Sequence, residues 1–153
     1  MKFYIGIDPG QKGGLSLITN DGKAVEYERM PETPGGIYQF FTDALVASEN
    51  QLVTVMESGG GGGSAVGTFA AKSAGLYLGY FRMLCAVVGV PLHEVHPATW
   101  KANMRVRSAK DTSIRMAEQL FPTVNLLFPR CTKKHDGCAE ALLIAEWGRR
   151  KGL

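Results

Sequence analysis

Four acidic residues stand at positions where they could bind metal ions. Asp8 and Glu57 each end a short apolar run, and Asp136 and Glu140 lie four residues apart at the start of the last predicted helix. Carboxylate oxygens select hard cations such as magnesium or manganese. Two such ions about 4 Å apart can activate a water molecule and stabilise the leaving oxygen of a phosphodiester. The four carboxylates therefore predict metal-dependent hydrolysis of a phosphodiester bond.

Each carboxylate also has a simpler interpretation. Asp136 would make a good helix N-cap, Glu140 could occupy a solvated helix position, and Asp8 could belong to an Asp-Pro-Gly turn. Residues four apart share one helix face, so Asp136 and Glu140 can reach the same neighbours. Because all four acidic positions occur in one small chain, we favour metal ligands over four unrelated structural roles. Crowding them without metal would raise the pKa of at least one.

The predicted strands bring Asp8 and Glu57 to one edge of a sheet. Asn-Asp-Gly is a hairpin signal, so the chain should open with antiparallel strands. Helical spacing after Pro34 predicts a crossover helix, and a right-handed crossover sets the following strand parallel to the first. The expected strands run from Phe3 to Asp8, Gly14 to Ile18, Lys23 to Arg29 and Leu52 to Met56.

A run of five glycines, residues 59–63, follows Glu57. Such a run allows either a disordered loop or a backbone that presses against a sugar-phosphate chain. Because the run directly follows a candidate metal ligand, we favour contact of Gly60 and Gly61 with substrate.

The helical pattern that opens at Ser64 predicts a helix of about 24 residues, about 36 Å long. Gly75 and Gly79 lie one turn apart within it. A glycine in a helix interior costs about 1 kcal/mol relative to alanine, so this stripe should permit a close approach. Either the chain's own sheet or a second copy of the helix could make that approach, and we favour the sheet.

The remaining pattern completes an α/β fold. A strand, a short helix and two longer helices are expected, and the order βββαβαβα with a C-terminal helix is that of the ribonuclease H-like fold. We therefore expect a five-stranded mixed sheet, three antiparallel strands and then two parallel ones, flanked by helices in a single domain over residues 1–153. The later elements run from Leu92 to His96, Ala98 to Asn103, Ser108 to Phe121 and Asp136 to Arg150.

The amino-acid composition indicates the cellular setting of the protein and the kind of partner it binds. The chain has 153 residues, 45% of them hydrophobic. Its first apolar stretch meets a charge too soon for a signal peptide, and no stretch approaches the roughly 20 apolar residues of a membrane span, so we expect the protein to stay in the compartment where it is made. Three cysteines without metal-site spacing predict a reduced, intracellular setting. The net charge is only +3, but eleven basic residues fall in the C-terminal third. That asymmetry predicts a polyanion partner, with solvated helix surfaces as the alternative.

Several motifs together resemble the RuvC family of Holliday junction resolvases, particularly its compact bacteriophage-type members. The likeness runs over essentially the whole chain. It is carried by Ile-Gly-Ile-Asp-Pro-Gly at residues 5–10, Val-Met-Glu at 55–57, Pro-Ala-Thr-Trp-Lys at 97–101 and His-Asp-Gly-Cys-Ala-Glu-Ala-Leu at 135–142.

The resemblance implies a homodimeric, magnesium-dependent endonuclease that makes paired nicks across a four-way DNA junction, leaving 5′-phosphate and 3′-hydroxyl ends. A homodimer supplies the two symmetric sites that paired nicks require. Asp8, Glu57 and Glu140 match the family's acidic positions, whereas Asp136 lies one residue earlier than the family's spacing places it. Manganese should substitute for magnesium, with two ions in each active site. A bacterial or phage-infected host cytoplasm would be the setting.

The expected DNA contacts come from the basic third, the glycine run and the long helix. Lys101 and Lys110 fall near family lysines that face the scissile phosphate, and we place Lys110 in the catalytic group. Phe69 falls in a region that contacts the junction centre in relatives, with a core role as the alternative. His135 could be a surface residue, a proton shuttle or a DNA contact. The remaining expected contacts are Arg105, Arg107, Lys133 and Lys134.

Three other functions remain open from the sequence. A broader nuclease acting on forks and flaps would need the same ions. A non-catalytic, structure-specific DNA-binding module would not cleave. The Asp-Pro-Gly segment also resembles the first phosphate loop of actin-like sugar kinases and ATPases, but those proteins clasp a nucleotide between two such domains and 153 residues supply one.

Overall fold

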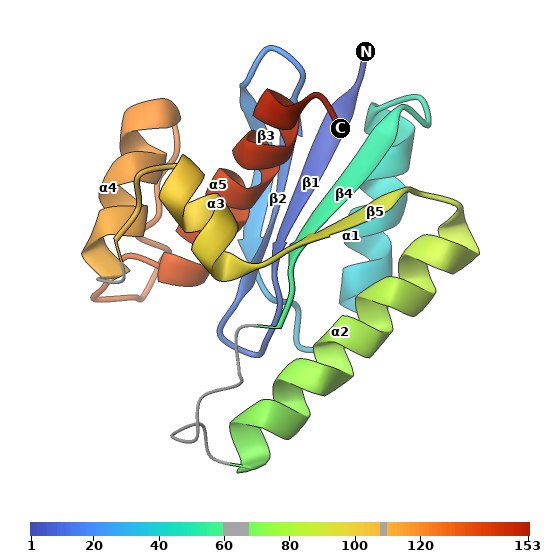
Figure 1. The fold of residues 1–153 in the computed structure, drawn as a ribbon, viewed down its shortest axis with the longest axis horizontal. Helices are drawn as coiled ribbons and strands as arrows, with labels where there is room; N and C mark the ends of the chain where they lie inside the picture. The colour runs from blue at the N-terminus through green and yellow to red at the C-terminus, as the bar shows by residue number, and fades with distance from the viewer. Residues whose placement is uncertain (60–67, 108–109) are drawn as a thin grey trace.

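A five-stranded mixed sheet forms the centre of the protein, in the order β3-β2-β1-β4-β5 (Figure 1). The computed structural model describes residues 1–59, 68–107 and 110–153. β1 pairs antiparallel with β2, and β2 with β3, whereas β1 with β4 and β4 with β5 are parallel. The predicted mixed sheet is therefore confirmed. The strands are β1 (Phe3–Asp8), β2 (Gly14–Thr19), β3 (Ala24–Arg29), β4 (Leu52–Glu57) and β5 (Leu92–Val95).

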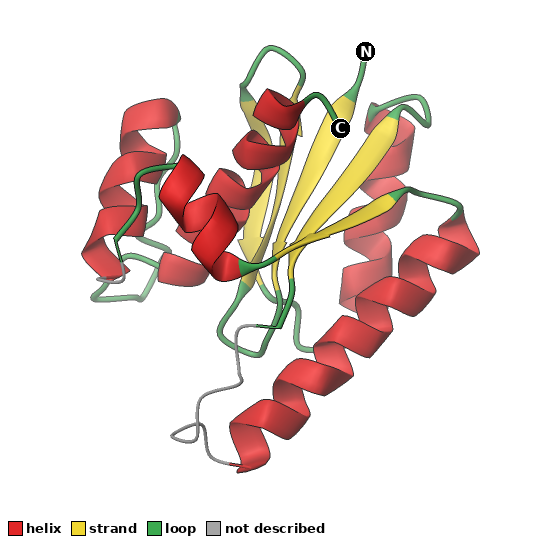
Figure 2. Cartoon of the chain, viewed as in Figure 1, coloured by secondary structure: helices red, strands yellow, loops and turns green. Residues whose placement is uncertain are grey.

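Helices cover both faces of the sheet, as Figure 2 shows. α5 lies on one face with α3 and α4 beside it, and α1 and α2 lie on the other. The alternation of strand side chains produces this division, because Tyr4 packs in the core cluster with α5 while Ile5 and Ile7 pack with α1 and α2. The helices are α1 (Pro34–Ala47), α2 (Thr68–Val88), α3 (Pro97–Asn103), α4 (Lys110–Leu120) and α5 (Asp136–Lys151).

Local signals in the sequence explain the connections. Gly22 has φ +82° in the β2–β3 hairpin, as the Asn-Asp-Gly turn predicts. α1 begins at Pro34, and the side chain of Thr33 caps it by accepting a hydrogen bond from the Gly36 N–H at 3.1 Å. α2 is described over 21 residues, and the expected start of the long helix at Ser64 lies outside the described residues.

α5 packs unusually close to β1 and β2. A Cβ atom added to Gly6 would lie 2.0 Å from the Ala141 carbonyl oxygen, and one added to Gly14 would lie 2.9 Å from the Cys138 Cα. A Cβ on Gly137 would lie 2.5 Å from the Lys12 carbonyl oxygen. Helix backbone therefore touches strand backbone along this seam, which only glycine permits.

Among the residues that the structure describes, no helix combines the length and the apolar character needed to cross a membrane.

The seam predicts a large difference between two glycine substitutions. Gly6→Ala should lower the free energy of unfolding by about 1–3 kcal/mol or more, because the added methyl group clashes with the backbone of α5. Gly35→Ala in the exposed first turn of α1 meets only Thr33 Oγ1 at 3.9 Å. It should change stability by no more than about 1 kcal/mol, in the stabilising direction. Urea denaturation of both variants measures this, and equal stability for the two would contradict the tight seam.

Candidate active site

The register of β1 and β4 places Asp8 beside Glu57. Their last paired residues are Ile7 and Met56, so Asp8 and Glu57 occupy the next position on each strand. Alternate residues of a strand share a face. Asp8 therefore lies on the same face as Gly6, and Glu57 on the same face as Val55. That is the face covered by α5.

The N-terminus of α5 adds the other two acidic residues. Asp136 is the first residue of α5, and Glu140 lies one turn further along. The N-cap is His135, whose Nδ1 accepts a hydrogen bond from the Cys138 N–H at 3.1 Å. The alternative that Asp136 itself caps the helix is therefore wrong. Close contact of Gly137 with the β1–β2 loop sets this turn beside the end of β1.

The acidic residues are close enough to repel one another. Burial, and then the neighbouring charges of Glu140 and Glu57, hold the pKa of Asp8 well above its usual range. Lys101 acts in the opposite direction on the pKa of Asp8, and Asp136 raises it further. The structure thus brings all four predicted carboxylates, Asp8, Glu57, Asp136 and Glu140, into one electrostatically coupled cluster, the acidic group.

Two side chains of α3 and one of α4 hold the glutamates. Trp100 Nε1 donates a hydrogen bond to Glu57 Oε2 at 2.7 Å. Lys101 Nζ and Ser113 Oγ each donate to Glu140 Oε1 at 3.0 Å. Burial raises the pKa of Glu57, while the Trp100 N–H and the Lys101 charge lower it. These three donors offset part of the repulsion within the acidic group.

The donor chemistry suits a hard divalent cation. Carboxylate oxygens are the ligands magnesium prefers, and added positive charge would relieve the repulsion that raises the pKa of Asp8. In the described part of the chain, no group of three or more histidine, cysteine, aspartate and glutamate side chains is arranged to hold an ion as the side chains stand. Lys101 and Ser113 both occupy Glu140 Oε1. Among the described residues, Glu140 Oε2 accepts no hydrogen bond, so a cation could bind Glu140 through that oxygen.

The predicted DNA contacts fall into four groups. Arg105, Arg107 and Lys133 are exposed. Lys134 is exposed too but forms an ion pair with Glu118 at 2.6 Å. Lys101 and His135 lie at the acidic residues, where Lys101 contacts Glu140 and His135 caps α5. Gly60 and Gly61 lie outside the described residues, as do the side chains of Phe69 and Lys110.

Part of the basic C-terminal third neutralises acidic groups of the protein itself. Arg149 and Arg150 both contact the buried carboxylate of Glu146 at 2.7 Å. Arg115 pairs with Asp111 one turn away on α4. The surface left for a polyanion is therefore smaller than the count of basic residues suggests.

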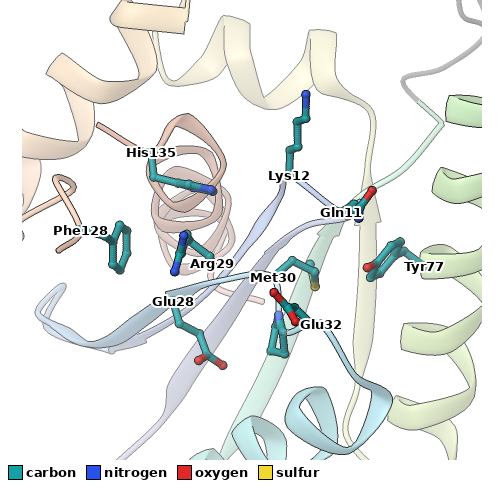
Figure 3. A pocket seen from close by; sticks show the side chains of 10 residues that line it. Gln11, Lys12, Glu28, Arg29, Met30, Glu32, Tyr77, Phe128 and His135 are labelled. Atoms are coloured by element: carbon teal, nitrogen blue, oxygen red, sulfur yellow. The ribbon is translucent and has the colours of Figure 1, made fainter. Parts of the chain in front are cut away.

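A cavity of about 860 Å³ opens beside the N-terminus of α5. Figure 3 shows Lys12 from the β1–β2 loop, Arg29 from the end of β3 and His135 around it, with Tyr77 of α2 opposite. Within residues 1–59, 68–107 and 110–153, Lys12 and Arg29 form no ion pair with a carboxylate. Both charges are thus available to an anionic ligand near the acidic group.

Sequence reasoning missed Trp100, Ser113, Lys12 and Arg29 as site residues. Trp100 stands in the Pro-Ala-Thr-Trp-Lys motif beside Lys101, which was a usable signal. Ser113 and Arg29 carried none, because their place at the site depends on how α4 and β3 pack.

Three solved structures share this arrangement of elements. RuvC of Thermus thermophilus in complex with a Holliday junction substrate matches with a TM-score of 0.67 at 19% identity, covering 99% of this chain and 97% of that one. Another structure of Thermus thermophilus RuvC gives 0.64 at 20% identity, covering 98% and 96%. The large terminase nuclease from the thermophilic phage G20c gives 0.50 at 13% identity, covering 94% and 80%. No family model and no curated protein matches the chain.

These likenesses establish the fold. The protein is an α/β protein of the ribonuclease H-like class, as the order of its elements predicted. More particularly, it has the fold of RuvC over nearly its whole length.

The raised pKa of Asp8 predicts how stability depends on pH without divalent metal. A carboxyl group whose pKa is higher in the folded state stabilises the fold below its unfolded pKa, and this contribution is lost as the pH rises through the folded pKa. Asp8→Asn should therefore raise the melting temperature near neutral pH, and the gain should vanish below about pH 4.

Thermal denaturation in EDTA from about pH 4 to about pH 8 measures this effect. The exposed Asp43→Asn controls for the amide substitution itself. A loss of stability in Asp8→Asn that is equal at every pH would show that the acidic group is not under repulsion.

Proposed function

We propose that the protein is a divalent-metal-dependent endonuclease that resolves four-way DNA junctions by paired phosphodiester hydrolysis. The observation that carries this proposal is the coupling of Asp8, Glu57, Asp136 and Glu140 at one edge of a RuvC-like sheet. The resemblance of the sequence motifs to RuvC, and the solved RuvC complex with a Holliday junction, support this choice of substrate.

The four carboxylates would hold two magnesium ions, with manganese as a substitute. When bound, these ions would activate a water molecule and neutralise charge on the phosphodiester. The protein's own contribution is to hold the acidic residues on rigid strand and helix ends and to bring Lys101 beside them, 3.0 Å from Glu140. We propose Lys110 as a second cation at the phosphate, on the basis of the family resemblance.

We infer a path for DNA across the exposed cations around the site. Arg105, Arg107 and Lys133 are exposed, and Lys12 and Arg29 line the cavity at the N-terminus of α5. Phosphate contacts of this kind make binding fall steeply with salt and carry little sequence information. Binding would therefore be directed by the shape of the branched DNA. The thiols of all three cysteines are free, which fits action in a bacterial or phage-infected cytoplasm.

Cleavage of a labelled, mobile four-way junction in magnesium tests the function. The wild type should make paired symmetric nicks. Glu57→Gln should lower the cleavage rate at least about 100-fold, because removing a metal ligand should cost more than removing a residue that only orients a ligand. Glu26→Gln, an exposed carboxylate on β3, should cut like the wild type.

Duplex, fork and flap DNA separate the alternatives. Equal cutting of forks and flaps would replace the resolvase with a broader branched-DNA nuclease. Binding to the junction without cutting, in both magnesium and manganese, would instead establish a non-catalytic DNA-binding module.

We also propose that the protein acts as a homodimer through α2. The exposed face of α2 carries Leu76, Tyr80, Met83 and Val87 at intervals of three and four residues, with Met83 66% and Val87 72% exposed. An apolar groove of about 230 Å³ lies between this face and α1, and Tyr38 is among its lining residues. A second copy with the same apolar stripe would bury these side chains.

The positions of Gly75 and Gly79 in α2 also support this face as the dimer interface. A Cβ added at Gly75 or Gly79 would meet no described atom within 4 Å beyond the helix's own nearby backbone. The expectation that they pack on the chain's own sheet is therefore wrong. Their exposure favours the other alternative, close approach of a second copy.

A charge introduced into the exposed apolar face of α2 should dissociate the dimer. Met83→Glu should shift the protein from dimer to monomer in light scattering, because the carboxylate would be buried without a partner. Paired nicking of the junction should fall with it, while single nicks persist. Val46→Glu, an equally polar change at an exposed residue outside the stripe, should leave the dimer intact. A monomeric wild type would contradict the assignment.

A further inference from the structure

Trp100 reaches the acidic group from inside the protein core. Its side chain is fully buried, and Nε1 donates to Glu57 Oε2 at 2.7 Å. A hydrogen bond this short to a carboxylate is charge-assisted and fixes the orientation of the acceptor. Because the indole has no access to solvent, it cannot contact DNA. Any effect of Trp100 on the site must act through the residues it touches.

The surroundings of Trp100 hold the indole in place. α3 begins at Pro97, and His96 caps it by accepting a hydrogen bond from the Ala98 N–H at 3.3 Å. Trp100 belongs to the core cluster between the sheet and α5. Lys101 Nζ lies 5.1 Å from the centre of the indole ring, so the same ring also steadies the ammonium group that contacts Glu140.

The hydrogen bond from Trp100 leaves one oxygen of Glu57 available to a ligand. Oε2 is engaged by the indole, whereas Oε1 accepts no hydrogen bond from the described residues. Burial raises the pKa of Glu57, and the indole N–H lowers it, so the hydrogen bond favours the carboxylate anion. A carboxyl group that is oriented in this way, and that accepts no hydrogen bond from the described residues at its second oxygen, is suited to bind a cation through that oxygen.

We propose that Trp100 is a positioning residue that fixes Glu57 for cation binding through Oε1. The proposal rests on the proposed function, because it requires Glu57 to be a metal ligand. It adds a residue that touches neither metal nor DNA and yet sets the affinity of the site. Partners that orient a metal ligand in this way typically change metal affinity or activity by about 10–100-fold.

Manganese binding by calorimetry tests the proposal without reference to cleavage. Wild type is compared with Trp100→Phe and with a protein that carries benzothienylalanine at position 100, which keeps the shape of indole but replaces its N–H with sulfur. Both changes should weaken manganese binding by about 10–100-fold. Phe121→Leu, a buried change in the same core cluster, should lower the melting temperature without altering manganese affinity.

The outcomes separate positioning from packing. Unchanged manganese affinity in the benzothienylalanine protein would overturn the proposal, as would a wild type that binds no manganese. Equal weakening in Phe121→Leu would show that only core packing matters, which also overturns it. If the wild type binds manganese but cuts no branched DNA, the nuclease function fails, while the comparison of affinities still decides the role of Trp100.

Discussion

The close contact between α5 and the first two strands is the constraint on which the candidate site depends. Gly6 and Gly14 on the strands let the helix approach until backbone meets backbone, and Gly137 does the same against the β1–β2 loop. A helix held at the usual distance by larger side chains would carry Glu140 away from Asp8. The same contact brings like charges together, so the geometry that creates the site also makes it electrostatically unfavourable without cations.

Hydrogen-bond donors on α3 and α4 partly offset this repulsion. α3 lies beside α5 and supplies the Trp100 N–H to Glu57 and the Lys101 ammonium to Glu140. α4 adds the Ser113 hydroxyl. Charged groups that lose water need such partners to remain ionised. The helices beside α5 thus stabilise the acidic group and at the same time decide which carboxylate oxygens remain available.

Features that depend on local sequence pattern were predicted correctly, whereas features that depend on tertiary packing were not. Strand ends at Asp8 and Glu57, the parallel crossover and the start of α5 follow from apolar runs, turn residues and helix spacing. The alternative that Asp136 caps α5 was wrong, because the preceding His135 takes that place and histidine is an uncommon cap. Gly75 and Gly79 were expected to pack on the sheet, and only the fold shows that they face outward. Trp100 and Ser113 meet the acidic residues through tertiary contacts that no spacing encodes.

Anomalous diffraction from crystals soaked in manganese would test most directly whether the acidic group is a metal centre. We predict anomalous density bounded by the carboxylates of Asp8, Glu57 and Glu140, with the hydrogen bond from Trp100 to Glu57 retained. Manganese density found only elsewhere on the protein would contradict this prediction.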